Sequence, residues 1–164
     1  MNDLDALDTD TQRDLNRIAD FRTTPFCYLC YIDCPGGRCP KCFSDDLMRH
    51  LKGVGVEYGY EWVIKHLIKT ELEEITEEEQ DELVSDSVDE SYGSETKIGW
   101  MTVNTSTIMK EYDPISWRIG INEYFDDSDQ YIEIDGALYY IHKLEEWIEE
   151  QLLDIPDPED EDND

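Results

Sequence analysis

The sequence predicts an α+β fold in which a small cysteine-rich module precedes a mixed helical domain that ends in a β-hairpin and a helix. Three observations support this prediction. Two Cys-x2-Cys pairs lie close together near the N-terminus, and apolar residues recur at helical spacing between Tyr60 and Leu72. Near the C-terminus, Asp135-Gly136 joins two apolar runs, which is typical of a hairpin with a type I′ turn.

Around the cysteine segment, the local patterns predict helices. Apolar residues three apart favour a short amphipathic helix over residues 9–20. This helix is expected to end before Pro25, because the residue that precedes a proline disfavours the helical conformation. Ser44 precedes two aspartates and resembles an N-cap, so a short helix is expected from there to about Leu51. The three glycines that follow, up to Gly59, are expected to form a flexible connector.

Capping signals predict the helices of the acidic half. Thr76-Glu-Glu-Glu79 is a capping-box pattern, which should open a helix that runs through Val84. Residues 85–95 are expected to form a loop, and residues 97–103 a strand.

The rest of the chain is expected to alternate helices with the hairpin. A short helix is predicted over 105–112, and Asp113-Pro114 has the pattern that begins another, running to about Phe125. Its inward residues are expected to be Ile115, Ile119 and Ile121. After the hairpin over 131–141, a final helix is predicted over 143–153, and the four tryptophans are all expected to be buried.

Cysteine spacing predicts a metal site. The two pairs are Cys27/Cys30 and Cys39/Cys42, and thiolates at this spacing can bind two by two to one tetrahedral zinc ion. Four sulfur ligands leave no open coordination position, so one structural Zn²⁺ per chain is expected. Cys34 is the spare thiol by symmetry, although it could replace Cys30 or Cys39.

Residues 26–44 resemble a short zinc ribbon, in which two knuckles of the Cys-Pro-x-Cys-Gly type face each other. Cys39-Pro40-Lys41-Cys42 matches the second knuckle. Elsewhere the chain departs from the pattern: Tyr31 and Phe43 stand where that family usually has glycine, and Tyr28 replaces the proline of the first knuckle. The remainder of the chain resembles no family.

These patterns predict four regions: an acidic N-terminal arm with a short helix (1–24), the zinc module (25–44), an acidic α+β domain (45–153) and a disordered acidic tail (154–164). Clustered reduced cysteines, an acidic N-terminus and the lack of a long apolar run favour a cytoplasmic protein.

The charge is unevenly distributed. Residues 1–70 contain 9 Lys/Arg and 11 Asp/Glu, whereas residues 71–164 contain 4 and 31, and the chain carries −29 in all. Salt adaptation would spread the acids evenly, and the chain has only three alanines. A charge that serves solubility alone is a further explanation. Direct binding of nucleic acid is not expected, because the chain lacks the cations that neutralise phosphates.

We interpret the acidity as a surface for a basic protein partner, in particular one that itself binds nucleic acid. In composition only, the acidic half is similar to small DNA-mimicking inhibitors that phages and plasmids use against host nucleases. The expected partner-binding residues are the acids of three blocks: Glu73, Glu74, Glu77, Glu78, Glu79, Asp81 and Glu82; Asp126, Asp127 and Asp129; and Glu145, Glu146, Glu149 and Glu150.

Two other functions remain open from the sequence. The first is an adaptor of the transcription, replication or chaperone machinery that docks through the acidic half. The second is an enzyme, for which His142 and Glu145, one helical turn apart, are the best acid–base pair. Histidine at a strand–helix junction is more often a cap or a surface residue, so no catalytic residue is assigned. The sequence does not determine the oligomeric state.

Overall fold

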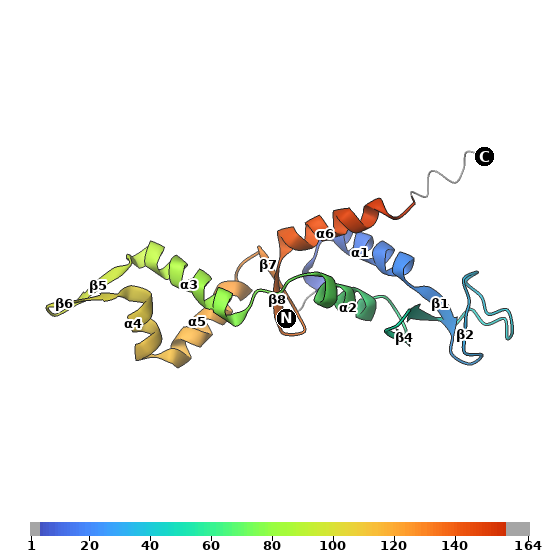
Figure 1. Cartoon of the computed structure of the whole chain (residues 1–164), viewed down its shortest axis with the longest axis horizontal. Coiled ribbons are helices and arrows are strands. Elements are labelled where there is room, and N and C mark those ends of the chain that lie inside the picture. The colour runs from blue at the N-terminus through green and yellow to red at the C-terminus, as the bar shows by residue number, and fades with distance from the viewer. Residues whose placement is uncertain (1–3, 157–164) are drawn as a thin grey trace. The chain divides into compact units, whose positions relative to one another are not determined.

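A computed structural model describes residues 4–156, whose helices and strands are labelled in Figure 1. The α+β prediction is confirmed. Backbone contacts divide the chain into two compact units. The first consists of Met1–Glu73 with His142–Asp164, and the second of Glu74–Ile141. The part of the expected tail from residue 157 onward lies outside the described residues.

The first unit combines helices with a small antiparallel sheet. Its elements are the 3-10 turn η1 (Leu4–Ala6), α1 (Thr9–Arg22), β1 (Thr24–Cys27), β2 (Ile32–Asp33), β3 (Met48–Leu51), β4 (Gly55–Glu57), α2 (Glu61–Glu71) and α6 (Ile141–Leu153). The strands form one sheet in the order β2-β1-β3-β4, and every neighbouring pair is antiparallel. The helices therefore provide the core of this unit, while the sheet leads into the cysteine segment.

The core of the first unit consists of the apolar stripes of its three helices, whose side chains lie three or four residues apart and are buried. They are Leu15, Ile18 and Ala19 of α1; Val63, Ile64, Leu67 and Ile68 of α2; and Leu144, Trp147 and Ile148 of α6. Arg22 adds polar links, because its guanidinium donates to Gln151 at 2.8 Å and pairs with Glu71 at 3.0 Å. The helical patterns in 9–20, 60–72 and 143–153 are confirmed.

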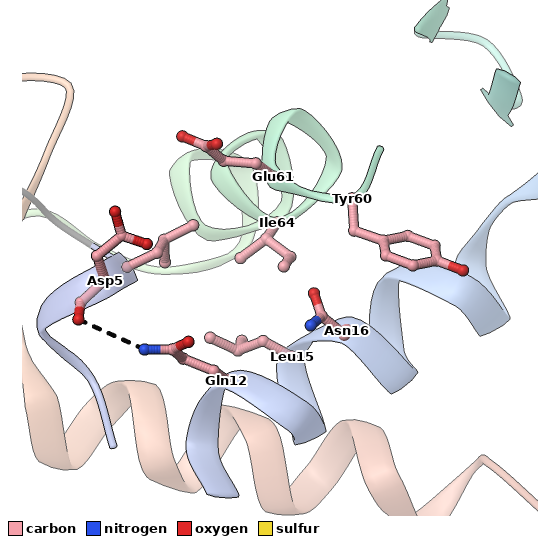
Figure 2. A pocket seen from close by; sticks show the side chains of 8 residues that line it. Asp5, Gln12, Leu15, Asn16, Tyr60, Glu61 and Ile64 are labelled. Atoms are coloured by element: carbon pink, nitrogen blue, oxygen red, sulfur yellow. Dashed lines mark hydrogen bonds between the residues drawn. The ribbon is translucent and has the colours of Figure 1, made fainter. Parts of the chain in front are cut away.

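A hollow of about 210 Å³ lies between α1 and α2 (Figure 2). Leu15 of α1 and Ile64 of α2 lie across it from each other. The side-chain amide of Gln12 donates to the backbone carbonyls of Asp5, at 3.4 Å, and Leu7, at 2.7 Å. These bonds hold the N-terminal turn against α1, so the hollow results from the way this turn packs.

The predicted helix from Ser44 is wrong, because the chain is extended there and forms β3. Strand β3 pairs with β1 on one side and with β4 on the other, for example at Pro25–Arg49 and His50–Val56. A helix this short has too few internal hydrogen bonds to be stable alone, whereas β3 is hydrogen-bonded along both edges. The glycine-containing connector forms the turn of the β3–β4 hairpin and β4 itself.

The second unit consists of three helices and two hairpins: α3 (Glu77–Tyr92), β5 (Glu95–Ile98), β6 (Met101–Asn104), α4 (Thr105–Tyr112), α5 (Pro114–Asp126), β7 (Tyr131–Ile134) and β8 (Ala137–Tyr140). Several local signals are confirmed. The Thr76 hydroxyl accepts from the Glu79 backbone N–H at 3.2 Å, and Asp113 caps α5. Asp135 and Gly136 have φ values of 50° and 85°, as the type I′ turn requires.

The loop predicted over 85–95 is wrong, because α3 continues to Tyr92 and ends at Gly93, whose φ is 87°. The reason is tertiary packing: Val84 and Val88, four residues apart, pack into a cluster with Phe125. Residues 97–103 do not form one strand, since β5 and β6 form a hairpin that turns at Gly99.

The inward face predicted for α5 is correct only for Ile121. Ile115 and Ile119 are 74% and 52% exposed, because the helix turns Trp117, Ile121 and Phe125 toward α3 instead. Trp100 also departs from the prediction, being 96% exposed at the turn of the β5–β6 hairpin.

Candidate metal site and acidic surface

The first cysteine pair lies where β1 ends. Cys27 is the last residue of β1, and the backbone N–H of Cys30 donates to the Cys27 sulfur at 3.4 Å. Tyr31 follows with a φ of 55°, in the left-handed region that glycine usually occupies. The tight knuckle turn therefore forms although the chain has tyrosine at the glycine position of the family it resembles.

The second pair repeats this geometry after β2. The backbone N–H of Cys42 donates to the Cys39 sulfur at 3.5 Å, and that of Phe43 donates to the Cys39 carbonyl at 2.9 Å. Phe43 has a φ of 59°, so it plays the same part as Tyr31 in the first turn. In each knuckle, the backbone N–H of the second cysteine thus donates to the sulfur of the first.

The structure brings the four predicted cysteines together, and their sulfurs all lie within 4.8 Å of one another. The Cys27 and Cys42 sulfurs are 3.7 Å apart. A tetrahedral ion with metal–sulfur distances of ~2.3 Å needs sulfurs roughly 3.8 Å apart, so the cluster fits such an ion. Cys27 and Cys39 are buried, Cys30 is half-buried and Cys42 is exposed. These four cysteines could hold a metal ion.

The thiols have very different acidities. Backbone N–H groups of Cys42 and Lys41, with the neighbouring sulfurs, lower the pKa of Cys39 to about 6, although burial acts in the opposite direction. Burial and the neighbouring sulfurs raise the pKa of Cys30 to about 12. The positive charge of a divalent metal ion would favour the thiolate form of all four.

Cys34 is not part of the four-sulfur cluster. It is buried beside Cys27 and Cys39, its thiol donates to the Ile32 carbonyl at 3.5 Å, and its backbone N–H donates to the Pro25 carbonyl at 2.7 Å. Cys34 therefore extends the β1–β2 pairing and fills the small core beneath the knuckles.

Thirteen of the fourteen predicted partner-binding acids are exposed: Glu73, Glu74, Glu77, Glu78, Glu79, Glu82, Asp126, Asp127, Asp129, Glu145, Glu146, Glu149 and Glu150. Ten of them lie on α3, α5 and α6 or at the C-cap of α5, whereas Glu73 and Glu74 lie between α2 and α3 and Asp129 lies between α5 and β7. Those of α3 and α5 and their flanks lie in the second unit, apart from Glu73, and those of α6 lie in the first.

Asp81 differs from the other acids because it is half-buried and engaged within the second unit. One carboxylate oxygen accepts from the indole N–H of Trp117 at 2.7 Å, and the other accepts from the Lys110 ammonium. Burial alone would raise the pKa of Asp81, but these two donors and the Lys110 charge lower it. Its geometry is that of an internal link between α3, α4 and α5.

Two of the histidines lie in clearly different surroundings. His142 and Glu145 are both exposed in the first turns of α6. The ring Nδ1 of His50 lies 2.7 Å from the carboxylate of Asp33, a polar contact between β3 and β2 that no local pattern predicts, because the two residues are 17 apart in the sequence. The Phe26 ring contacts His50, so this pair stabilises the sheet.

Two arginines, Arg38 and Arg49, form contacts within the first unit. Arg49 donates to the Thr23 hydroxyl at 2.9 Å, pairs with Asp20 at 3.1 Å and lies over the Tyr60 ring. Arg38 donates to the Phe43 carbonyl at 3.2 Å. These contacts hold both guanidinium groups within the first unit.

Large exposed side chains surround the knuckles: Tyr28, Leu29, Tyr31 and Phe43. A second set, which includes Tyr92, Met109 and Tyr112, lies on the helices of the second unit. The helical spacing of Val84, Val88 and Tyr92 was the available signal, but it is hidden among serines and acids.

Within residues 4–156, no helix is long and apolar enough to cross a membrane. Comparisons of the whole chain with protein-family models, with curated proteins and with solved structures found no match.

Proposed function

We propose that this chain is a non-enzymatic, acidic zinc-binding protein whose partner is a basic, nucleic-acid-binding protein, bound in the manner of a DNA mimic. Such a protein would inhibit a host nuclease or a related defence system. The observation that carries the proposal is the exposure of thirteen of the fourteen candidate acids, ten of which lie on helices or at a helix cap.

The metal in this proposal is Zn²⁺, one per chain. Thiolates are soft ligands that select zinc over Mg²⁺ or Ca²⁺, and four of them close a tetrahedral shell. Few apolar side chains of this segment are buried, since the cluster of Cys27, Cys34 and Cys39 adds Cys30, Ile32 and Leu47, all partly buried. The ion would therefore supply folding energy, and the thiols would require a reducing compartment such as the cytoplasm.

The acids would act as a field rather than as single contacts. Duplex DNA carries one negative charge per ~1.7 Å of its axis, and a groove built to hold it attracts any surface of similar charge density. Residues 77–79 place three consecutive carboxylates in the first turn of α3, and Asp126, Asp127 and Asp129 follow one another where α5 ends. Carboxylates held on helices keep their spacing, as phosphates do.

Exposed ion pairs contribute only ~0.2–1 kcal/mol each, so affinity should fall in small, additive steps as the acids are neutralised. The test captures partners from a cell lysate on the immobilised, zinc-loaded chain at low salt. Elution with rising salt, and in parallel with duplex DNA, then separates the bound proteins. Recovery of basic proteins that both salt and DNA displace is the expected result.

A matched pair of variants makes the test specific. One carries Glu77, Glu78 and Glu79 changed to Gln; the other carries the same loss of three charges at Asp5, Asp45 and Glu57, which are exposed acids of the first unit. The first variant should lose more affinity than the second. Equal losses would mean that only the net charge matters, and bound proteins that DNA leaves in place would contradict the mimic.

An adaptor is the second candidate, and the exposed side chains around the knuckles favour it. Tyr28, Leu29, Tyr31 and Phe43 would give the zinc module an apolar contact surface of its own. An adaptor binds its target equally well in the presence of DNA. Retention of the partner during DNA elution, together with its loss on Leu29→Ser, would therefore assign this function instead.

A further inference from the structure

The helices of the second unit enclose an open hollow of about 450 Å³. Every residue that lines it belongs to α3, α4 or α5 or to the cap between the last two, and these helices pack together in Figure 1. The apolar part of the lining includes Val88, Tyr92, Met109, Tyr112, Trp117 and Gly120. We call this hollow the helical groove.

The helical groove has the composition of a binding site. Tyr92 and Tyr112 are 76% and 87% exposed at its walls, and Met109 is also exposed. Tyrosine, tryptophan and methionine are enriched where proteins contact partners, because they bury a large area at a low entropic cost. Large apolar side chains gathered around one hollow, instead of scattered singly, indicate an interaction surface.

Gly120 keeps the helical groove open. It lies in the interior of α5, where glycine is unfavourable, and no turn or positive φ requires it there. A Cβ built at this position meets no atom within 4 Å. The absent side chain therefore leaves free space in the wall of the groove.

The charge around the helical groove determines what can enter it. Helices α3, α4 and α5 contain eleven acids and two bases, and both bases are already paired, Lys110 with Asp81 and Arg118 with Glu77. A second copy of the chain would bring the same kind of charge, because the second unit contains 18 acids and only 3 bases. The occupant must therefore have an apolar side and a cationic side.

Backbone hydrogen bonding favours a helix over an extended peptide. No strand contributes to the lining of the helical groove, so an extended chain placed there would find no backbone partners for its N–H and C=O groups. A helix satisfies these groups itself and presents anchors at the i, i+3, i+4 and i+7 positions.

We propose that the helical groove binds a basic amphipathic helix of the partner protein, with apolar anchors in the groove and Lys or Arg facing the acids of α3 and α5. This proposal rests on the proposed function in taking the partner to be basic. It goes further by placing the specific contact in an apolar groove, whereas the acids provide attraction at longer range.

The test uses the full zinc-loaded chain and a labelled synthetic helix of leucine and lysine, with its leucines at the i, i+3, i+4 and i+7 positions. Binding is measured by fluorescence anisotropy at fixed salt. Gly120→Trp fills the groove without changing the charge and should weaken binding by about tenfold or more, equivalent to ~1.4 kcal/mol. Gly120→Ala, which adds one methyl group in free space, should leave the affinity within about twofold.

A second pair of variants avoids any effect on folding. Tyr112→Ser changes an exposed side chain in the groove and should weaken binding, whereas Trp100→Ser changes an even more exposed one outside it and should not. A control peptide with serine in place of leucine keeps the charge; its binding should be weak and insensitive to Gly120→Trp.

Three results would overturn the proposal: no binding of the leucine–lysine helix, equal binding by the Gly120→Trp and Gly120→Ala chains, or self-association of the chain that Gly120→Trp abolishes. The last would assign the groove to a second copy. Because the probe is synthetic, these results are independent of the lysate experiment. Equal binding by the two variants that still falls with salt would reject the groove and leave the acidic surface standing.

Discussion

Replacing Asp81 with Asn should destabilise the second unit, even though it removes a negative charge from a chain that carries −29. Asp81 accepts from the Trp117 indole at 2.7 Å and from the Lys110 ammonium. Asparagine keeps one oxygen for the indole, but its NH₂ group would face the ammonium, donor against donor. The substitution therefore removes the charged hydrogen bond and leaves the shape of the side chain unchanged.

The magnitude follows from the burial of the pair. A hydrogen bond to a charged group contributes ~1.5–3 kcal/mol. The side chains of Asp81 and Lys110 are 36% and 31% exposed, so solvent screening reduces the expected loss to roughly 1–2 kcal/mol. Relief of repulsion between neighbouring acids on α3 acts in the opposite direction, by at most ~0.5 kcal/mol. The hydrogen bond should outweigh it.

The control is Glu82→Gln, which removes the same charge from the adjacent, exposed position. Thermal unfolding should give a lower Tm for Asp81→Asn, by about 4–8 °C for each kcal/mol in a unit of this size, and an unchanged or slightly higher Tm for Glu82→Gln. Amide hydrogen exchange should locate the loss in α3 and α5. If Asp81→Asn unfolds at the same temperature as Glu82→Gln, the link to Lys110 contributes nothing and the reasoning fails.

The same carboxylate gives a pH dependence. The pKa of Asp81 is lowered in the folded chain, so its stabilisation is fully present above the ordinary value of 3.8 and is lost as the pH falls through the lower, folded value. The difference in stability between the natural chain and Asp81→Asn should therefore be largest near neutral pH and should shrink below about pH 4. A difference that stays constant down to acid pH would contradict the lowered pKa.

Three further predictions concern other regions. Single changes to Ser at Cys27, Cys30, Cys39 or Cys42 should release zinc, measured by metal analysis of the purified protein, whereas Cys34→Ser should retain it; the reverse pattern would show that the ligand set is wrong. Gly136→Ala should lower the stability of the second unit by about 1 kcal/mol, because its φ is 85°, whereas Gly120→Ala should raise it; thermal unfolding of both tests this. Deleting residues 157–164, which contain no large apolar residue, should leave the Tm nearly unchanged, and a large drop would mean that the segment is buried somewhere.

Short-range signals predicted much of this fold. The caps at Thr76 and Asp113 and the Asp135-Gly136 turn each act through atoms within a few residues, so the sequence alone contains them. The cysteine pairs belong to the same class, since each pair closes its own turn through an N–H to sulfur bond. These local features were all confirmed.

The predictions failed where contacts between residues far apart in the sequence determine the local structure. Strand β3 exists because β1 and β4 hydrogen-bond it on both sides, whereas the local signal was the cap-like Ser44 that precedes the strand. On α5, two apolar stripes compete, and only the packing of Trp117 against α3 selects the buried one. The helical groove depends on these long-range contacts, so no local sequence pattern predicts it.

The insertion of one unit into the other has a consequence for how the protein is assembled. The second unit begins at Glu74 and ends at Ile141, between α2 and α6 of the first. Near these ends, the Ile75 backbone N–H donates to the Leu138 carbonyl at 2.7 Å, so the chain enters and leaves the unit at neighbouring points. A segment with adjacent ends can be removed or exchanged as one block while a short linker closes the gap. The first unit, which contains the four-cysteine cluster, can thus accept a different inserted segment without redesign of its core.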